Sequence, residues 1–573
     1  MNKETKNCQN CKKDFTIENE DFSFYEKIKV PPPTFCPECR LQRKLAYRNE
    51  RRLYRRTCDL CKKTSITIYP EDVKFPVYCT TCWWSDNWDA LQYAQDYDFN
   101  RGFFDQYKEF SDKVPHLGMP SPSNNYNSEY TSWVDECKNC YLVFGSSRCE
   151  DTSYGELLYG CRNSADCTNC NDLELSYQCV NSKTCYRCIW CVNAVNCNEC
   201  YFCFDCRGCG NCFLSFNQRN KNYLILNKQY TKAEWEVKMK EILGSHSKMW
   251  EALAEFKKLL KGKALHKFAN VIQTTNSSGN NLIETKNAYH CFDSSKLEDC
   301  RYISYGDEIK DCMDSYAIVE KSELCYENFS TRITARSHFM IGSWESNTDM
   351  MYSQYIAGGS NLFGCMGLRK KSYHILNKQY DKESFKRTVE QIIAAMKEKG
   401  EYGEFFPVSI SPFGYNETLA FDYYPMTKEQ AVGKGYGWRD DIGGTFGKET
   451  LKAFELPDHI REVKDTIASE IIACMKCDKN FRIVPQEINF YRTTNIPLPR
   501  HCPDCRYYER LSFRNSRKLF LRVCGCQSGL GSYQNTVKHL HGDQPCQNKF
   551  ETSYAPERPE IVYCEQCYNA EVA

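Results

Sequence analysis

The chain has 573 residues, 38 of them cysteines, and a formal charge of +1 at neutral pH. This length is sufficient for several domains, and the near-neutral charge excludes a polycation, so any nucleic-acid surface must be a local patch. No apolar run approaches the length of a membrane span, so we expect no membrane association.

The N-terminus, Met-Asn-Lys-Glu-Thr-Lys-Asn-Cys, lacks the apolar segment of a signal peptide. We therefore expect a cytoplasmic protein. In that reducing compartment, spaced Cys-x-x-Cys pairs are typical of zinc ligands rather than of disulfides.

Residues 1–90 contain two pairs of Cys-x-x-Cys motifs, separated by twenty-four residues in the first pair and seventeen in the second. Two such motifs supply four thiolates, which suits a tetrahedral zinc ion. We predict a tandem zinc-ribbon pair with the ligands Cys8, Cys11, Cys36 and Cys39, then Cys58, Cys61, Cys79 and Cys82.

A basic segment follows Cys39. Arg40, Lys44 and Arg48 are spaced four residues apart, on one face of an expected helix, and Arg51 follows. One hypothesis is that these four side chains bind the phosphates of a nucleic acid, either structured RNA or DNA. The alternative is a solvated helix face whose arginine stems pack over the cysteine motif.

Residues 91–122 are predicted to be a short helix and a linker, and residues 123–227 a cysteine-rich β-solenoid. Sixteen cysteines between Cys137 and Cys212 are all separated by multiples of three residues. A helix repeats near 3.6 residues and a strand at 2, whereas a short-coil solenoid can repeat at 3. A coil of twelve residues fits best, and eighteen is also compatible. Asn, Asp and Gly are frequent just before the inward position, where a corner needs them.

Three interpretations of this cysteine ladder stay open. The thiols form a structural core, because free cysteine packs as a small hydrophobic residue. Alternatively they bind metal or an iron–sulfur cluster, since Cys197 to Cys212 contains a CxxCxxCxxC run, although without the Cys-Pro ending. The third interpretation, a ladder of disulfides, conflicts with a reducing compartment.

The central region is an internal duplication. The phrase from Arg219 to Tyr230 recurs from Arg369 to Tyr380, 150 residues later. We predict a helical segment at 228–263, a second β-solenoid at 264–377, a helix at 378–400 and a linker region at 401–470. The second copy keeps few cysteines, which favours a packing role for the ladder; they are Cys291, Cys300, Cys312, Cys325 and Cys365.

Residues 471–573 repeat the zinc-ribbon pair of residues 1–90. The predicted ligands are Cys474, Cys477, Cys502 and Cys505, then Cys524, Cys546, Cys564 and Cys567. About twenty extra residues separate Cys524 from Cys546, and they hold or adjoin Cys526, His539 and His541; Cys526 or His541 could replace Cys524. The equivalent basic residues, also predicted to contact nucleic acid, are Arg506, Arg510, Arg514 and Arg517.

The Cys-x-x-Cys and Cys-Pro-x-Cys-Arg motifs resemble zinc-ribbon and treble-clef proteins. Their arrangement resembles a family of large, cysteine-rich zinc-ribbon proteins of small-genome candidate-phylum bacteria, over nearly the whole chain. The resemblance implies a cytoplasmic zinc protein. The expected fold is multidomain and mainly β, with zinc ribbons or treble clefs at both ends flanking two short-coil β-solenoids and connecting α-helices.

The predicted function is a non-enzymatic scaffold that binds about four zinc ions and contacts nucleic acid through the basic segments. One alternative is a protein-interaction scaffold that uses the solenoid faces, and another is a metal, cluster or redox protein that uses the ladder. The chain contains no P-loop, HExxH, dinucleotide-binding or serine-elbow motif, so we predict no enzyme.

Overall fold

The computed structural model describes residues 3–122, 124–526, 533–542 and 544–572. It is mainly β, with some helices and several groups of four cysteines, as predicted. The chain divides into two compact units, each made of segments far apart in sequence. Unit 1 contains Met1–Ser123 and Asn270–Ile442, and unit 2 contains Asn124–Ala269 and Gly443–Ala573.

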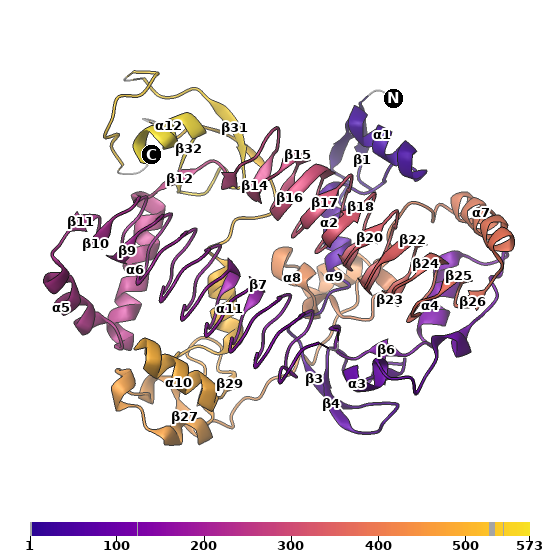
Figure 1. The fold of residues 1–573 in the computed structure, drawn as a ribbon, viewed down its shortest axis with the longest axis horizontal. Coiled ribbons are helices and arrows are strands. Elements are labelled where there is room, and N and C mark those ends of the chain that lie inside the picture. Colours follow the sequence, from indigo (N-terminus) through magenta and orange to yellow (C-terminus); the bar gives the residue numbers. More distant parts are fainter. Residues whose placement is uncertain (1–2, 123, 527–532, 543, 573) are drawn as a thin grey trace. The chain divides into compact units, whose positions relative to one another are not determined.

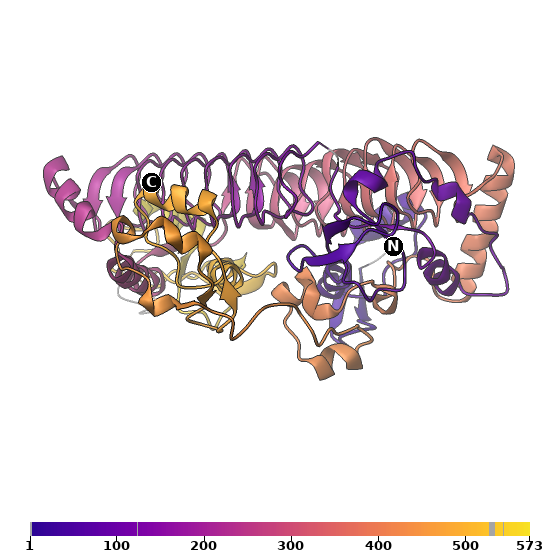
Figure 2. The same cartoon turned by 90° about the horizontal axis from the view of Figure 1, so that it is seen from below.

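In unit 2, residues 124–226 form a series of short parallel coils, which we call the first coil stack (Figure 2). Residues pair with those twelve positions later, from Tyr126 with Lys138 to Arg207 with Arg219. The coil therefore has twelve residues rather than eighteen. Most pairings are single bridges, and longer strands form at β7 (Glu156–Tyr159), β8 (Thr168–Asn171), β9 (Gly210–Phe213) and β10 (Asn222–Ile225).

The coil corners explain the period of three. The residue just before each inward position has a left-handed backbone at almost every corner, for example Asn139 with φ of 52° and Asp166 with φ of 54°. Asn, Asp and Gly tolerate this conformation, which confirms the interpretation of their position in the sequence. Trp190 and Phe202 adopt it too, at a cost that the surrounding coils must offset.

In unit 1, residues 270–376 form the second coil stack, with the same parallel pairing. Two coils contain one extra residue, because Met313 pairs with Tyr326 and His338 with Met351 at a distance of thirteen. The longer strands include β13 (Val271–Ile272), β14 (Gly279–Ile283), β15 (Lys286–Tyr289), β16 (Cys291–Arg301), β17 (Asp307–Lys310), β18 (Val319–Glu323), β19 (Phe329–Thr331), β20 (Thr334–Ala335), β21 (Ile341–Trp344), β22 (Asn347–Met351), β23 (Gln354–Ala357), β24 (Ser360–Phe363) and β25 (Ser372–Ile375).

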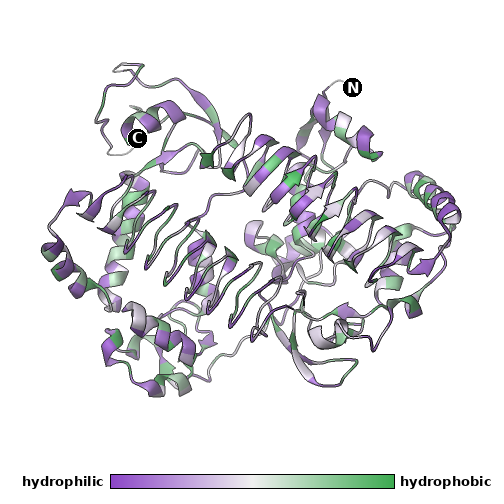
Figure 3. Cartoon of the chain, viewed as in Figure 1, coloured by the Kyte–Doolittle hydropathy of each residue, from purple (hydrophilic) through white to green (hydrophobic). Residues whose placement is uncertain are grey.

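The inward residues of the two stacks differ in chemistry but not in burial. Cysteines dominate the interior of the first stack, whereas Leu297, Ile309 and Ile318 lie in the interior of the second. Figure 3 shows hydrophobic and hydrophilic residues alternating along the coils of each stack. The same backbone therefore accepts thiols or aliphatic side chains inside.

Each cysteine module combines a β-hairpin with a helix. The hairpins are β1 (Glu4–Asn7) with β2 (Asp14–Ile17), β3 (Tyr54–Thr57) with β4 (Thr64–Thr67), β28 (Ile472–Ala473) with β29 (Asn480–Phe481), and β30 (Phe520–Val523) with β31 (Lys549–Thr552). The helices that follow are α2 (Pro37–Leu45), α3 (Thr80–Trp83), α11 (Pro503–Leu511) and α12 (Glu565–Val572).

Further helices pack within each unit. Unit 1 contains α1 (Asn19–Ile28), α4 (Phe103–Ser111), α7 (Lys382–Glu398), α8 (Leu419–Tyr423) and α9 (Lys428–Gly433), and unit 2 contains α5 (Lys232–Ile242), α6 (His246–Gly262) and α10 (Pro485–Thr494). The remaining short strands are β5 (Val77–Tyr78), β6 (His116–Leu117), β11 (Lys228–Gln229), β12 (Leu265–Lys267), β26 (Lys378–Gln379), β27 (Leu451–Lys452) and β32 (Ile561–Tyr563). The predicted linker at 401–470 contributes buried residues such as Phe406 and Ile460 to the cores. Among the described helices, none is long and apolar enough to span a membrane.

Candidate metal centres

The structure brings together each of the four predicted cysteine quartets. Within each quartet, all four sulfur atoms lie within 4.8 Å of one another. A tetrahedral zinc ion with Zn–S bonds of 2.3 Å would hold its sulfurs about 3.8 Å apart. The sulfurs of Cys11 and Cys36 are 3.7 Å apart, and those of Cys477 and Cys502 are also 3.7 Å apart. The quartets therefore fit a tetrahedral metal ion.

The same backbone contact recurs in all four modules. The first cysteine of the second motif donates its backbone N–H to the sulfur of the first cysteine of the module, at 3.2 to 3.3 Å; the pairs are Cys36 to Cys8, Cys79 to Cys58, Cys502 to Cys474 and Cys564 to Cys524. Such a bond stabilises a thiolate rather than a thiol. Cys524 therefore occupies the position of Cys8 in the fourth module, and the quartet there is Cys524, Cys546, Cys564 and Cys567.

Local hydrogen bonds favour ionised sulfur in two quartets. A hydrogen bond from the Cys39 thiol is the main reason that the pKa of Cys36 falls to about 5. A bond from Cys502 likewise lowers the pKa of Cys474 to about 4. Cys36 is also the N-cap of α2, where the helix dipole favours negative charge.

A fifth group, which the sequence analysis did not assemble, lies beside the fourth quartet. The ligand atoms of Cys526, His539, His541 and Cys567 all lie within 4.8 Å of one another. The signal in the sequence was the Cys- and His-bearing insertion of this module, which the other three modules lack. The fifth group shares Cys567 with the fourth quartet.

The predicted basic residues of unit 1 are turned toward the second coil stack. The side chain of Arg40 is 2% exposed, and its Nε lies 2.8 Å from Asp314 Oδ1. Its guanidinium lies over the ring of Tyr302, 5.4 Å from the centroid. Lys44 is also buried and lies 3.3 Å from Glu327. These cations are paired with carboxylates of the coils.

Unit 2 repeats this arrangement. Arg506 lies 2.7 Å from Asp166 Oδ2 and 4.5 Å from the ring centroid of Tyr154. Arg510 lies 2.7 Å from the other oxygen of the same carboxylate and also contacts Gln178. The side chains of Arg510 and Asp166 are both 0% exposed. The two guanidiniums therefore share one buried carboxylate.

The remaining predicted basic residues behave similarly. Arg48 is buried, bonds to Glu50 and Ser330, and lies over the rings of Tyr316 and Phe329. Arg514 and Arg517 are buried, and Arg51 is half-buried. Of the eight residues predicted to contact nucleic acid, seven are thus less than 10% exposed in the described fold.

The aspartates that pair with Arg40 and Arg506 occupy equivalent positions of the duplication. Arg219 and Arg369 differ by 150 residues, and Asp166 and Asp314 differ by 148. The two extra residues in the coils after Asp314 account for the difference. Arg40 and Arg506 are both the first residue after a Cys-Pro-x-Cys motif. This equivalence is present in the sequence, but it can be recognised only when the register of the coils is known.

The thiols of the ladder cysteines contact backbone carbonyls inside the first coil stack. Most of the buried thiols point at the carbonyl nine residues later, as Cys191 does at 3.2 Å to Cys200 and Cys197 at 3.2 Å to Cys206. Ser182 makes the same contact at 3.0 Å. All sixteen are buried, and among the described residues no ladder cysteine belongs to a group of converging metal ligands.

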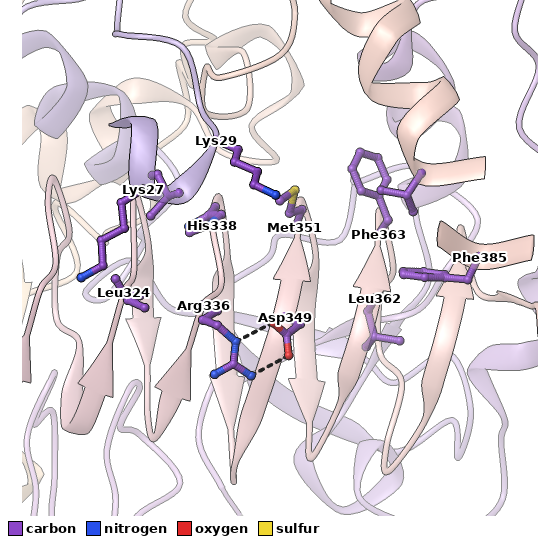
Figure 4. A pocket seen from close by; sticks show the side chains of 12 residues that line it. Lys27, Lys29, Leu324, Arg336, His338, Asp349, Met351, Leu362, Phe363 and Phe385 are labelled. Atoms are coloured by element: carbon purple, nitrogen blue, oxygen red, sulfur yellow. Dashed lines mark hydrogen bonds and ion pairs between the residues drawn. The ribbon is translucent and has the colours of Figure 1, made fainter. Parts of the chain in front are cut away.

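A cavity of about 370 Å³ lies between α1 and the second coil stack (Figure 4). Three of its charged side chains are paired: Arg336 lies 2.7 Å from Asp349, and Lys27 lies 3.0 Å from Asp311. Burial lowers the pKa of His338 to about 4, so this imidazole is neutral at pH 7. Among the described residues that line the cavity, no serine or cysteine lies beside it.

Comparisons with known proteins show no family. No protein-family model matches the chain, and no curated protein matches it. Among solved structures, it is similar to a protein titled "putative acetyltransferase" from Desulfovibrio desulfuricans G20, at 7% identity and a TM-score of 0.09, over 43% of this chain. The match spans 63% of that protein's length, and at this TM-score it carries no argument. The resemblance to zinc-ribbon proteins stays a prediction.

Proposed function

We propose that the protein is a zinc-stapled, non-catalytic scaffold, in which treble-clef-like zinc modules clamp two β-solenoids. The observation that carries this proposal is the repeated docking of an arginine on a coil aspartate, Arg40 on Asp314 and Arg506 on Asp166. In both cases the arginine is the next residue after a cysteine of the proposed zinc site. The metal therefore sets the position of the helix that holds the coils.

The chemistry of the quartets favours zinc. Four thiolates in a tetrahedral arrangement are the ligand set of structural zinc sites, and magnesium or calcium would require oxygen ligands. Each hairpin and helix is too small to form a self-sufficient core. A structural zinc contributes an apparent binding free energy of about 10–16 kcal/mol, which becomes folding free energy.

The nucleic-acid hypothesis requires the same arginines to bind phosphates. A phosphate could reach Arg506 or Arg510 only if these side chains left Asp166, with which they are buried. Breaking a buried ion pair typically costs about 3–5 kcal/mol. The scaffold proposal instead uses the side chains as they lie in the fold.

One experiment separates the two hypotheses. We expect Arg506→Gln to increase protease cleavage within residues 124–227 of the full-length protein, whereas Arg148→Gln, at an exposed pair on the same stack, leaves it unchanged. Fluorescence anisotropy with labelled RNA and DNA between 50 and 300 mM salt is measured on the same variants. The scaffold proposal is wrong if Arg506→Gln leaves protease resistance intact and weakens a salt-dependent nucleic-acid affinity.

A further inference from the structure

We propose that the fourth module binds two zinc ions, with the thiolate of Cys567 bridging them. One ion takes Cys524, Cys546, Cys564 and Cys567; the other takes Cys526, His539, His541 and the same Cys567. This second ion lies beyond the four single-zinc quartets of the proposed function.

The number of ligands matches a bridged pair. Two separate tetrahedral ions need eight ligands, and one shared thiolate reduces the requirement to seven. The two groups together contain seven residues, because Cys567 is the one residue common to both. A thiolate sulfur has enough lone pairs to bind two zinc ions.

The distances in the second group fit zinc. Zinc bonds of about 2.05 Å to nitrogen and 2.3 Å to sulfur place the two ligand atoms about 3.5 Å apart in a tetrahedron. Cys526 Sγ lies 3.2 Å from His539 Nδ1 and 3.4 Å from His541 Nε2. Cys567 Sγ also lies 3.4 Å from His541 Nε2. These nitrogens and sulfurs converge on one point.

The outer nitrogens of both imidazoles are held by acceptors. His539 Nε2 donates to Glu571 Oε1 at 2.8 Å, and His541 Nδ1 donates to the backbone oxygen of Gln544 at 2.7 Å. These bonds leave His539 Nδ1 and His541 Nε2 with free lone pairs facing the sulfurs. A carboxylate or carbonyl that orients a histidine in this way is typical of zinc ligands.

Glu571 is itself held in place, which makes the second ligand shell rigid. Its carboxylate accepts hydrogen bonds from the hydroxyl of Tyr533 at 2.6 Å and from the hydroxyl of Thr536 at 2.7 Å. The side chains of His539 and Glu571 are 1% and 0% exposed. The imidazole therefore cannot turn toward water.

An amide also donates to the sulfur of Cys526. The Asn535 side-chain amide donates to its sulfur at 3.1 Å, as the Asn10 amide does to the sulfur of Cys39 at 3.3 Å in the first module. Cys524 and Cys526 are separated only by Gly525, where a Cβ atom would lie 3.1 Å from the Val562 carbonyl oxygen. Glycine therefore suits the close approach to this carbonyl. The Cys-Gly-Cys sequence lets its two cysteines belong to different ions.

Metal content of the full-length protein, reconstituted with Zn²⁺ and dialysed against a mild chelator, tests the second ion. We expect five zinc ions per chain, one for each group. The double variant His539→Ala/His541→Ala removes ligands unique to the second ion, so the count falls to four. The matched control His290→Ala/His459→Ala, outside all the groups, keeps five. Four zinc ions in the wild type, or five in the His539/His541 variant, would overturn the proposal.

Cobalt tests the bridge without any substitution. In protein loaded with Co²⁺, two ions that share a thiolate couple antiferromagnetically, so the integrated electron paramagnetic resonance signal falls short of the metal count by the bridged pair. Five cobalt ions with five uncoupled spins would show that the ions are independent. If the protein binds four ions and loses its structure when they are removed, this inference alone is contradicted. If the structure survives the removal of all metal, the proposed function is contradicted.

Discussion

At the scale of single residues, the most consequential feature is one carboxylate that serves two cations. Asp166 lies 2.7 Å from both Arg506 and Arg510, and all three side chains are at most 3% exposed. Burial alone would lower the pKa of Arg506, but Asp166 and the neighbouring acidic groups outweigh it and keep the pKa above its ordinary value. The aspartate therefore holds α11 on the first coil stack.

Asp166→Asn removes this charge while keeping the shape of the side chain. We expect the free energy of unfolding of unit 2 to fall by about 3–5 kcal/mol, because two buried guanidiniums lose their main counter-charge. Urea unfolding measures the change. The control is Glu136→Gln, at the exposed pair with Arg148, which should not shift the midpoint measurably. Equal midpoints for the two variants would contradict this assignment.

His338 provides a pH-dependent prediction. Burial lowers its pKa to about 4 in the folded protein, against about 6.5 in the unfolded chain. The unfolded state then binds more protons between these values, so the stability that neutral His338 contributes is present above pH 6.5 and is lost as the pH falls toward 4.

We therefore expect His338→Leu to gain stability relative to the wild type as the pH falls from 7 to 4.5, by up to about 1.4 kcal/mol per pH unit. Chemical denaturation at each pH measures the difference between the two proteins, and any effect of pH on the metal sites is common to both. A difference that does not vary with pH would show that His338 is not buried as a neutral imidazole.

At the scale of the elements, the coil stack depends on an inward position that donates a hydrogen bond. Cys200 directs its thiol at the carbonyl of Cys209, at 3.5 Å, and Thr152 directs its hydroxyl at the carbonyl of Cys161, at 3.2 Å. Cysteine, serine and threonine thus perform the same task in one ladder. This equivalence favours packing and hydrogen bonding as the role of the thiols.

Cys200→Ser should accordingly leave the metal content unchanged and lower the free energy of unfolding by about 1 kcal/mol, because the hydroxyl replaces the thiol in the same contact. Cys200→Leu, which overfills the coil, should cost about 1–3 kcal/mol. Elemental analysis and urea unfolding provide the two measurements. Loss of a metal ion or of a visible cluster absorption in Cys200→Ser would favour the metal interpretation of the ladder.

At the scale of the whole molecule, each compact unit joins segments from distant parts of the chain. The C-terminal modules pack with the first coil stack, and the N-terminal modules pack with the second. Buried residues of α10, such as Tyr491, and of the coils, such as Tyr177, belong to one hydrophobic cluster. A module that loses its metal should therefore expose apolar coil residues more than three hundred positions away.

Cys502→Ser tests this long-range dependence. We expect faster hydrogen exchange in residues 474–512 and also in the first coil stack, because the altered cysteine is the N-cap of α11. Cys291→Ser, at a cysteine of the second coil stack that is equally buried, is the control and should leave both regions protected. Changes confined to residues 474–512 would show that the module does not support the coils.

The sequence predicted the local features well because each depends on neighbours in the chain. The spacing of the cysteines brings Cys8 near Cys11 through a tight turn, and the frequent Asn, Asp and Gly residues before the inward positions indicate the left-handed corners. The basic residues were harder to interpret, since the same helix face can meet water, phosphate or another part of the protein. Nothing local distinguishes Arg506 in solution from Arg506 on Asp166.

By itself, the sequence determined the four cysteine quartets, the duplication and the three-residue period, because bond geometry and backbone sterics act over a few residues. Only the tertiary structure decided which module packs on which coil stack, which carboxylates neutralise Arg40 and Arg506, and that Cys567 belongs to two groups of candidate metal ligands. Those outcomes depend on contacts between residues hundreds of positions apart, where burial and charge pairing select one arrangement from many that the local pattern allows.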